Sequence, residues 1–333
     1  RLVLLAIAAV PALFAPGKQA SAFVFLVALM NVPGAISSIA WQSLLAGAIP
    51  EEYRADALAA RSRLVTAVAF VPTLIGGYML DALSFPIGYQ LVLVAAFLSS
   101  VVEVRTLMRM REPEASRSGV AEGASRADGE GSVRMPRSYI AYCLVNGLFY
   151  LGWTMGAPLF TLYYVQVLKV GSMWVGAFNV ISMAVQYLAF PYWSRLARSR
   201  GSVLALGAAT AGMALTPILI GVSPSPWLVA VFCLSMGVFT SGTTLLLLNS
   251  LLGRAPERHR TAAIAIYNVV VNFASFLGPL LGNAVVLGAG IYWALGVCAL
   301  LRGAGAASIV GFARSLPASS RRAQPRSARM ASL

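Results

Sequence analysis

Long apolar runs separated by short polar connections dominate the chain. Most of these runs have the length of about 20 residues that a helix needs to cross a bilayer. Ten are apparent, covering residues 2–15, 21–48, 62–83, 87–108, 139–165, 172–194, 202–222, 226–252, 261–287 and 290–313. They are too long for strands and lack a period of two, and open sheet edges in lipid would leave backbone groups unpaired. The pattern predicts an all-α, polytopic membrane helix bundle.

Composition supports this prediction and narrows the chemistry. Hydrophobic residues make up 59% of the 333 residues and charged residues only 11%, whereas a soluble domain carries about 25% charged residues. Cys143, Cys233 and Cys298 all fall in apolar segments without CxxC spacing, so we interpret them as small core residues. The only histidine, His259, lies in a predicted loop. We therefore expect no cofactor and no structural metal.

The basic residues account for the net charge of +14 and gather in alternate connections. The other connections hold only Lys18 and Lys169. The clusters are Arg54, Arg61 and Arg63; Arg195, Arg198 and Arg200; Arg254, Arg258 and Arg260; and the arginines of 105–137 and of the tail. Such bias marks the cytoplasmic side of a membrane. We expect an integral protein of a bacterial cytoplasmic membrane, with both ends of the given chain in the cytoplasm and no nucleic-acid partner.

Residues 109–137 differ from their surroundings, because they lack aromatic residues and are rich in Gly, Ser, Ala and mixed charges. This composition buries too little apolar surface to order itself. We predict a flexible cytoplasmic linker between an N-terminal half, 1–108, and a C-terminal half, 138–313. Residues 314–333 are predicted to form a basic tail. Anionic-lipid binding by the linker or the tail is the alternative interpretation.

One stretch of the sequence occurs twice. At an offset of 206, residues 49–81 match residues 255–286, with aligned pairs Pro50–Pro256, Glu51–Glu257, Arg54–Arg260, Phe70–Phe276 and Gly76–Gly282. Internal repeats are common in transporters and indicate two halves of similar fold. By this offset, the counterpart of residue 138 would lie about 69 residues before Arg1. We expect a twelve-span parent that lacks its first two spans here, or alternatively a true ten-span protein.

These features resemble the major facilitator superfamily, which has two six-helix halves joined by a long cytoplasmic loop. Its loop motif, roughly G-x-L-A-D-R-x-G-R, resembles residues 194–202, where Leu196, Ala197 and Gly201 match and Arg198 replaces the aspartate. Its antiporter motif, Gly-Pro-x-x-Gly-Gly, is closer to residues 278–283 than to residues 72–77. The resemblance implies conformational roles for Glu51, Arg54, Arg195, Gly201, Glu257, Arg260, Gly278 and Pro279.

The resemblance also implies that helices four, seven and ten of the parent line a central cavity, which here are segments 21–48, 139–165 and 226–252. The polar side chains of the chain concentrate in the same segments, which fits the cost of placing them in lipid. The cavity-lining candidates are Ser38, Trp41, Gln42, Asn146, Tyr150, Trp153, Thr243, Thr244 and, from a flanking helix, Asn272. Hydrogen bonding within a helix or between helices is the alternative role for the Ser and Thr residues.

We therefore predict a secondary active transporter that moves a small neutral or amphipathic organic solute by alternating access, as an exporter and a monomer, with a proton or ion as a further partner. The alternatives are a metabolite or sugar importer of the same fold and a truncated membrane protein or scaffold that does not transport. No clustered nucleophile, base or metal ligand suggests an enzyme. Arg302, near the middle of segment 290–313, either snorkels, pairs with a carboxylate of the missing segment, or shows that the span is misplaced.

Overall fold

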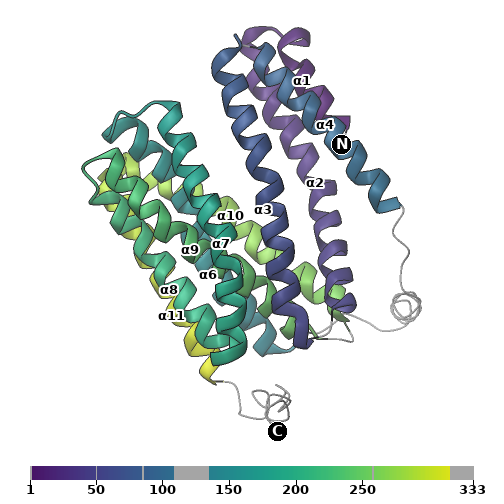
Figure 1. Cartoon of the computed structure of the whole chain (residues 1–333), viewed down its shortest axis with the longest axis vertical. Helices are drawn as coiled ribbons and strands as arrows, with labels where there is room; N and C mark the ends of the chain where they lie inside the picture. The colour runs from purple at the N-terminus through teal and green to yellow at the C-terminus, as the bar shows by residue number, and fades with distance from the viewer. Residues whose placement is uncertain (1, 50, 85, 109–134, 257–258, 316–333) are drawn as a thin grey trace. The chain divides into compact units, whose positions relative to one another are not determined.

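The computed structural model describes residues 2–49, 51–84, 86–108, 135–256 and 259–315. Every regular element among these residues is helical (Figure 1), which confirms the all-α prediction. The helices are α1 (Leu2–Leu13), α2 (Pro16–Ala48), α3 (Glu51–Ala82), α4 (Ile87–Met108), α6 (Arg137–Leu162), α7 (Ser172–Arg200), α8 (Ser202–Gly221), α9 (Pro226–Arg254), α10 (Arg260–Ala289) and α11 (Ile291–Ser315). A π-helical turn, η1 (Tyr163–Val167), continues α6. Most of the predicted linker and tail, and Glu257, lie outside the described residues.

Eight helices in the described part of the chain are long and apolar enough to cross a membrane. The two that do not meet this standard are α1 and α3. Helix α1 has only 12 residues. Helix α3 begins at Glu51, about three turns before the predicted apolar segment, and these added turns carry Arg54, Asp56 and Arg61. The additional turns therefore make α3 a long helix with one polar and one apolar half.

The described helices fall into two compact units, and the division passes through α3. The first unit comprises Arg1–Ala48 and Val71–Gly131, and the second comprises Ile49–Phe70 and Ser132–Leu333. In the first unit, α1 packs against α2 and α4. The Gln90 side-chain amide donates a hydrogen bond to the Ala8 carbonyl at 3.1 Å, which ties α4 to α1. Helix α2 exposes a run of large apolar side chains, including Phe23, Phe25 and Ile36, as expected for a surface that is not in water.

In the second unit, α6 packs between α10 and α11, and α8 packs between α9 and α11 (Figure 1). Its apolar core gathers around Met155, Leu159 and Cys298. All three cysteines are buried and free, in agreement with the interpretation as small core residues. The Trp193 indole N–H donates to the Val238 carbonyl at 2.7 Å and joins α7 to α9.

Glycines allow the backbones around α6 to approach closely. A Cβ atom on Gly152 would lie 2.8 Å from the backbone nitrogen of Arg302, and one on Gly305 would lie 2.6 Å from the Phe149 Cα atom. A Cβ atom on Gly278 would lie 2.7 Å from the Leu151 carbonyl oxygen on the other side of α6. Such small-residue contacts replace the hydrophobic driving force that lipid does not supply. The middle of α6 is therefore held tightly from two sides.

Candidate functional site

The aromatic face of α6 is the best-defined part of the predicted site. Tyr150 and Trp153 are both partly exposed, and their ring centroids lie 5.2 Å apart. Tyr267 of α10 stacks on Tyr142, with ring centroids 5.9 Å apart. The face thus combines flat apolar rings with hydroxyl groups and an indole N–H, which suits a solute that has both apolar and polar parts.

Asn146 lies one turn from Tyr150 but is only 1% exposed. Its amide nitrogen donates to the Tyr142 carbonyl at 2.7 Å, while its Oδ1 atom has no partner among the described residues. Thr243 of α9 is likewise fully buried, and its Oγ1 atom is also unpartnered within the described part of the chain. Buried polar atoms of this kind usually have a partner, often an ordered water. Both side chains are therefore buried inside the helix bundle and do not lie on its surface.

The other predicted cavity residues lie on α2, α9 and α10. Ser38 and Gln42 lie on α2, in the first unit, where the Gln42 amide donates to the Ser38 hydroxyl at 3.1 Å. Trp41 is partly exposed on the same helix. Thr244 of α9 and Asn272 of α10 are exposed. Their assignment to a cavity stays a prediction, as do the roles of the whole set.

Arg302 is the unexpected member of the site. It lies within α11, is only 2% exposed, and points at α6 and α8. Its Nε donates to the Gly152 carbonyl at 3.0 Å, its Nη2 to the Trp153 carbonyl at 3.0 Å, and its Nη1 to the Met213 carbonyl at 3.2 Å. The guanidinium also lies over the Phe160 ring at 5.4 Å. Because α11 is continuous and the side chain is buried, a misplaced span and snorkelling are both wrong.

The residues of the predicted loop motif occupy one end of α7. Gly201 has a φ of +91°, a conformation that favours glycine, and it lets the chain pass directly from α7 to α8. Arg198, which stands where the family motif has an aspartate, pairs with Asp56 of α3 at 2.8 Å. Arg63 of α3 lies over the Tyr187 ring of α7 at 4.6 Å. An acidic side chain from the first turns of α3, Asp56, therefore lies beside the position at which the family motif has an aspartate.

The other motif residues fall into two groups. Gly278 is buried and forms the close contact of α10 with α6, with Pro279 partly buried beside it. Arg54 is 6% exposed near the start of α3, and Arg260 is the first residue of α10. Glu51 begins α3. The loop predicted for the first copy is therefore wrong, because Glu51 and Arg54 lie within α3, whereas in the second copy Arg260 begins α10.

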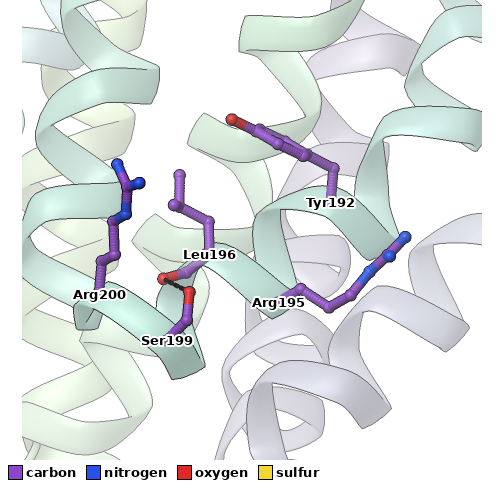
Figure 2. Close-up of a pocket in the computed structure, with 5 residues that line it drawn as sticks. All are labelled: Tyr192, Arg195, Leu196, Ser199 and Arg200. Atoms are coloured by element: carbon purple, nitrogen blue, oxygen red, sulfur yellow. Dashed lines mark hydrogen bonds between the residues drawn. The ribbon is translucent and has the colours of Figure 1, made fainter.

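A shallow pocket of about 320 Å³ lies at the end of α7, away from the aromatic face. Figure 2 shows its lining residues Tyr192, Arg195, Leu196, Ser199 and Arg200. The two guanidinium groups lie on opposite sides of the helix end, and the Ser199 hydroxyl donates back to the Leu196 carbonyl at 3.4 Å. Exposed arginines beside a tyrosine are typical of a membrane–water interface. We interpret this pocket as part of that interface and not as a solute site.

Sequence reasoning missed two contributors to the aromatic face. They are Tyr267 of α10 and Tyr142 of α6. The signal that would have found them is the series of aromatic residues along α6, which needs a partner helix with an aromatic residue. That series is Tyr139, Tyr142, Phe149, Tyr150 and Trp153.

The fold in the described part of the chain is a polytopic bundle of α-helices, eight of which are long and apolar enough to cross a membrane. A family model described as Major Facilitator Superfamily matches residues 142–331, more than half of the chain. The chain belongs to the major facilitator superfamily.

A solved structure that is similar to this chain is the crystal structure of the human organic anion transporter MFSD10 (TETRAN). The TM-score is 0.66 and the sequence identity 15%, over 92% of this chain and 75% of that chain. At this identity, the similarity shows the shared fold alone. No curated protein matches the chain.

Proposed function

We propose that this chain moves a small amphipathic organic solute across the membrane by alternating access, and that the solute contacts the aromatic face of α6. The observation that carries the proposal is the partly exposed pair Tyr150 and Trp153, whose rings lie 5.2 Å apart on α6. Rigid aromatic side chains with one polar atom each bind amphipathic molecules at low entropic cost.

We further propose that residues 1–108 and 138–313 are the two halves that rock against each other, joined by the linker 109–137. The arginine-rich helix ends, including that of α7, would then face the cytoplasm. Export is the direction we propose, because an amphipathic solute enters a cell through lipid unaided and only outward transport opposes this entry. A sugar importer would need many hydrogen-bonding side chains, which the aromatic face does not offer.

The experiment measures carrier-dependent uptake of an aromatic amide, 2-naphthamide, into proteoliposomes containing the purified protein. Tyr150→Ala and Trp153→Ala should each lower the initial rate about tenfold or more, because each removes a ring worth about 1–3 kcal/mol of contact. Trp293→Ala is the matched control, since Trp293 is a 71% exposed tryptophan on α11. Unchanged rates in both face variants, with folded protein, would contradict the site.

A further inference from the structure

The Arg254 guanidinium lies over the Tyr142 ring of the aromatic face at 5.2 Å, and a second positive charge, that of Arg302, lies directly behind Tyr150 and Trp153. Arg302 donates to the carbonyl of Trp153, one of the two residues that form the face, and to the carbonyl of its neighbour Gly152. Among the described residues, its hydrogen bonds go to carbonyl oxygens and no carboxylate pairs with it. Backbone dipoles solvate the guanidinium, and within the part of the chain that the structure describes no opposite charge neutralises it.

This position makes the charge effective at the face. Gly152 and Gly156 bring α11 against α6, while Tyr150 and Trp153 point from an adjacent side of the same helix. A group on the one side and a solute on the other are separated by roughly the diameter of a helix, about 10 Å. At an effective dielectric constant of about 20, a unit charge at that distance changes the binding of another unit charge roughly tenfold.

We propose that Arg302 makes this transporter selective for organic anions, by supplying a fixed positive charge behind the wall formed by Tyr150 and Trp153. This inference rests on the proposed function, because it assigns the charge of the solute that the aromatic face binds. Such a solute has an aromatic or aliphatic body and one anionic group. The body packs on the rings, and the anionic group is attracted by the buried guanidinium without touching it.

The three carbonyl bonds also explain why the charge stays in place. Met213 lies four residues before Pro217 in α8, and proline has no N–H to donate to that carbonyl. The Arg302 Nη1 atom takes the place of the missing donor. An arginine can satisfy three carbonyls from two helices at once, because its donors form a fixed planar fork. A neutral side chain of similar size would leave the Met213 carbonyl without this donor.

The test compares three probes that share one ring system and differ in charge: 2-naphthoate, 2-naphthamide and 2-naphthylmethylammonium. Initial rates of carrier-dependent uptake into proteoliposomes are measured below saturation, with the membrane potential clamped at zero, so that the driving force on charged probes is equal. The wild-type protein should take up the carboxylate roughly tenfold faster than the amide, and the ammonium more slowly than the amide.

Arg302→Gln removes the charge and should lower the carboxylate-to-amide ratio about tenfold, to near one. Arg302→Lys keeps the charge and should keep most of the carboxylate-to-amide ratio, although lysine cannot donate to all three carbonyls in the planar geometry of a guanidinium. Arg137→Gln is the matched control, because Arg137 is an exposed arginine at the start of the same helix α6 that bears the face. Its ratio should equal that of the wild type.

A second variant tests the charge where Arg302→Gln does not fold. Cys298 is fully buried one turn from Arg302, and its Sγ atom lies 3.2 Å from the Gly152 carbonyl oxygen. Cys298→Asp would place a carboxylate beside the guanidinium, neutralise it, and abolish the preference for the carboxylate probe. Cys298→Ser, of similar size but uncharged, should retain the preference.

Some outcomes would overturn the proposal. Wild-type uptake of the amide with no preference for the carboxylate would overturn the charge inference and leave the proposed transport intact. A folded Arg302→Gln or Cys298→Asp protein with the wild-type ratio would do the same. If no probe shows carrier-dependent uptake, the proposed function and this inference are both overturned.

Discussion

At the scale of single residues, Arg302 and Pro217 form a matched pair on different helices. The proline interrupts the hydrogen bonding of α8, and the arginine of α11 donates to the carbonyl that the proline leaves free. A buried arginine without a carboxylate is costly unless its donors are satisfied. Here three carbonyls satisfy them, so the two residues depend on each other.

This dependence predicts a coupling in a double-mutant cycle. Arg302→Gln alone should lower the free energy of unfolding by on the order of 3 kcal/mol, because charge-assisted hydrogen bonds are lost and a buried carbonyl is left unpaired. With Pro217→Ala in the background, the loss should be smaller by about 1 kcal/mol, since the alanine restores the backbone N–H donor within α8. Denaturant unfolding in detergent of the four proteins measures the coupling. Equal losses in both backgrounds would show that Arg302 does not compensate for the proline.

At the scale of elements, the motif residue Gly278 and the nearby Gly282 have a structural role that their positions in the sequence do not reveal. Gly278 lies against the backbone of α6 at Leu151 and Met155, and Gly282 lies against the Met155 side chain. These contacts fix the turn of α6 that carries Tyr150 and Trp153. The antiporter-like pattern therefore acts in this chain as a packing surface for the aromatic face.

Gly278→Ala should accordingly impair both stability and transport. A Cβ atom there would lie 2.7 Å from the Leu151 carbonyl oxygen, and such overpacking costs about 1–3 kcal/mol. Gly288→Ala, on the same helix, is the matched control, because nothing lies within 4 Å of a Cβ atom at that position. It should be neutral or stabilise the protein by up to about 1 kcal/mol. Thermal unfolding and 2-naphthamide uptake of the two variants decide the question, and equal behaviour would contradict the packing role.

Hydropathy predicted the helices well where lipid-facing surface decides their position. Segment 202–222, for example, is observed as Ser202–Gly221. It missed the first three turns of α3, because residues 51–61 carry several charged side chains and belong with the helices of the second unit. It also missed the π-helical turn of Tyr163–Val167 and the environment of Arg302. These features depend on contacts between residues distant in the sequence, such as the hydrogen bond from the Tyr163 hydroxyl to the Ser223 carbonyl, which no local pattern encodes.

At the scale of the whole molecule, α3 is the element that belongs to both compact units. The N-terminal part of α3, Glu51–Phe70, lies in the second unit, and the rest of the helix lies in the first. The visible links to α7 are the Asp56–Arg198 ion pair and the Arg63–Tyr187 contact. Both side chains of the ion pair are more than a third exposed, so the pair contributes little, within about 0.2–1 kcal/mol. Leu58 in the same part of α3 is only 1% exposed, and burial of a leucine side chain stabilises a fold by about 1.5–3 kcal/mol, more than such an ion pair.

This ranking predicts how the molecule behaves when its chain is cut. If a protease site is placed within residues 109–134 and cleaved in a mild detergent, the fragment with α1–α4 should co-purify with the fragment that begins near Pro136. Asp56→Ala should leave this association nearly unchanged, because an exposed ion pair is weak. Leu58→Asp should reduce it severalfold, because it places an unpaired carboxylate at a buried position of α3.

The matched control is Leu64→Asp, since Leu64 is 66% exposed on the same helix and the variant buries no charge. Quantitative pull-down through a tag on the C-terminal fragment compares the wild type and the three variants side by side. Loss of association in Asp56→Ala with retention in Leu58→Asp would reverse the ranking and make the ion pair the main link of α3 to α7. Retention in every variant would show that the polar half of α3 does not hold the fragments together. Only the expected order, with Leu58→Asp alone weakened, assigns that role to apolar burial.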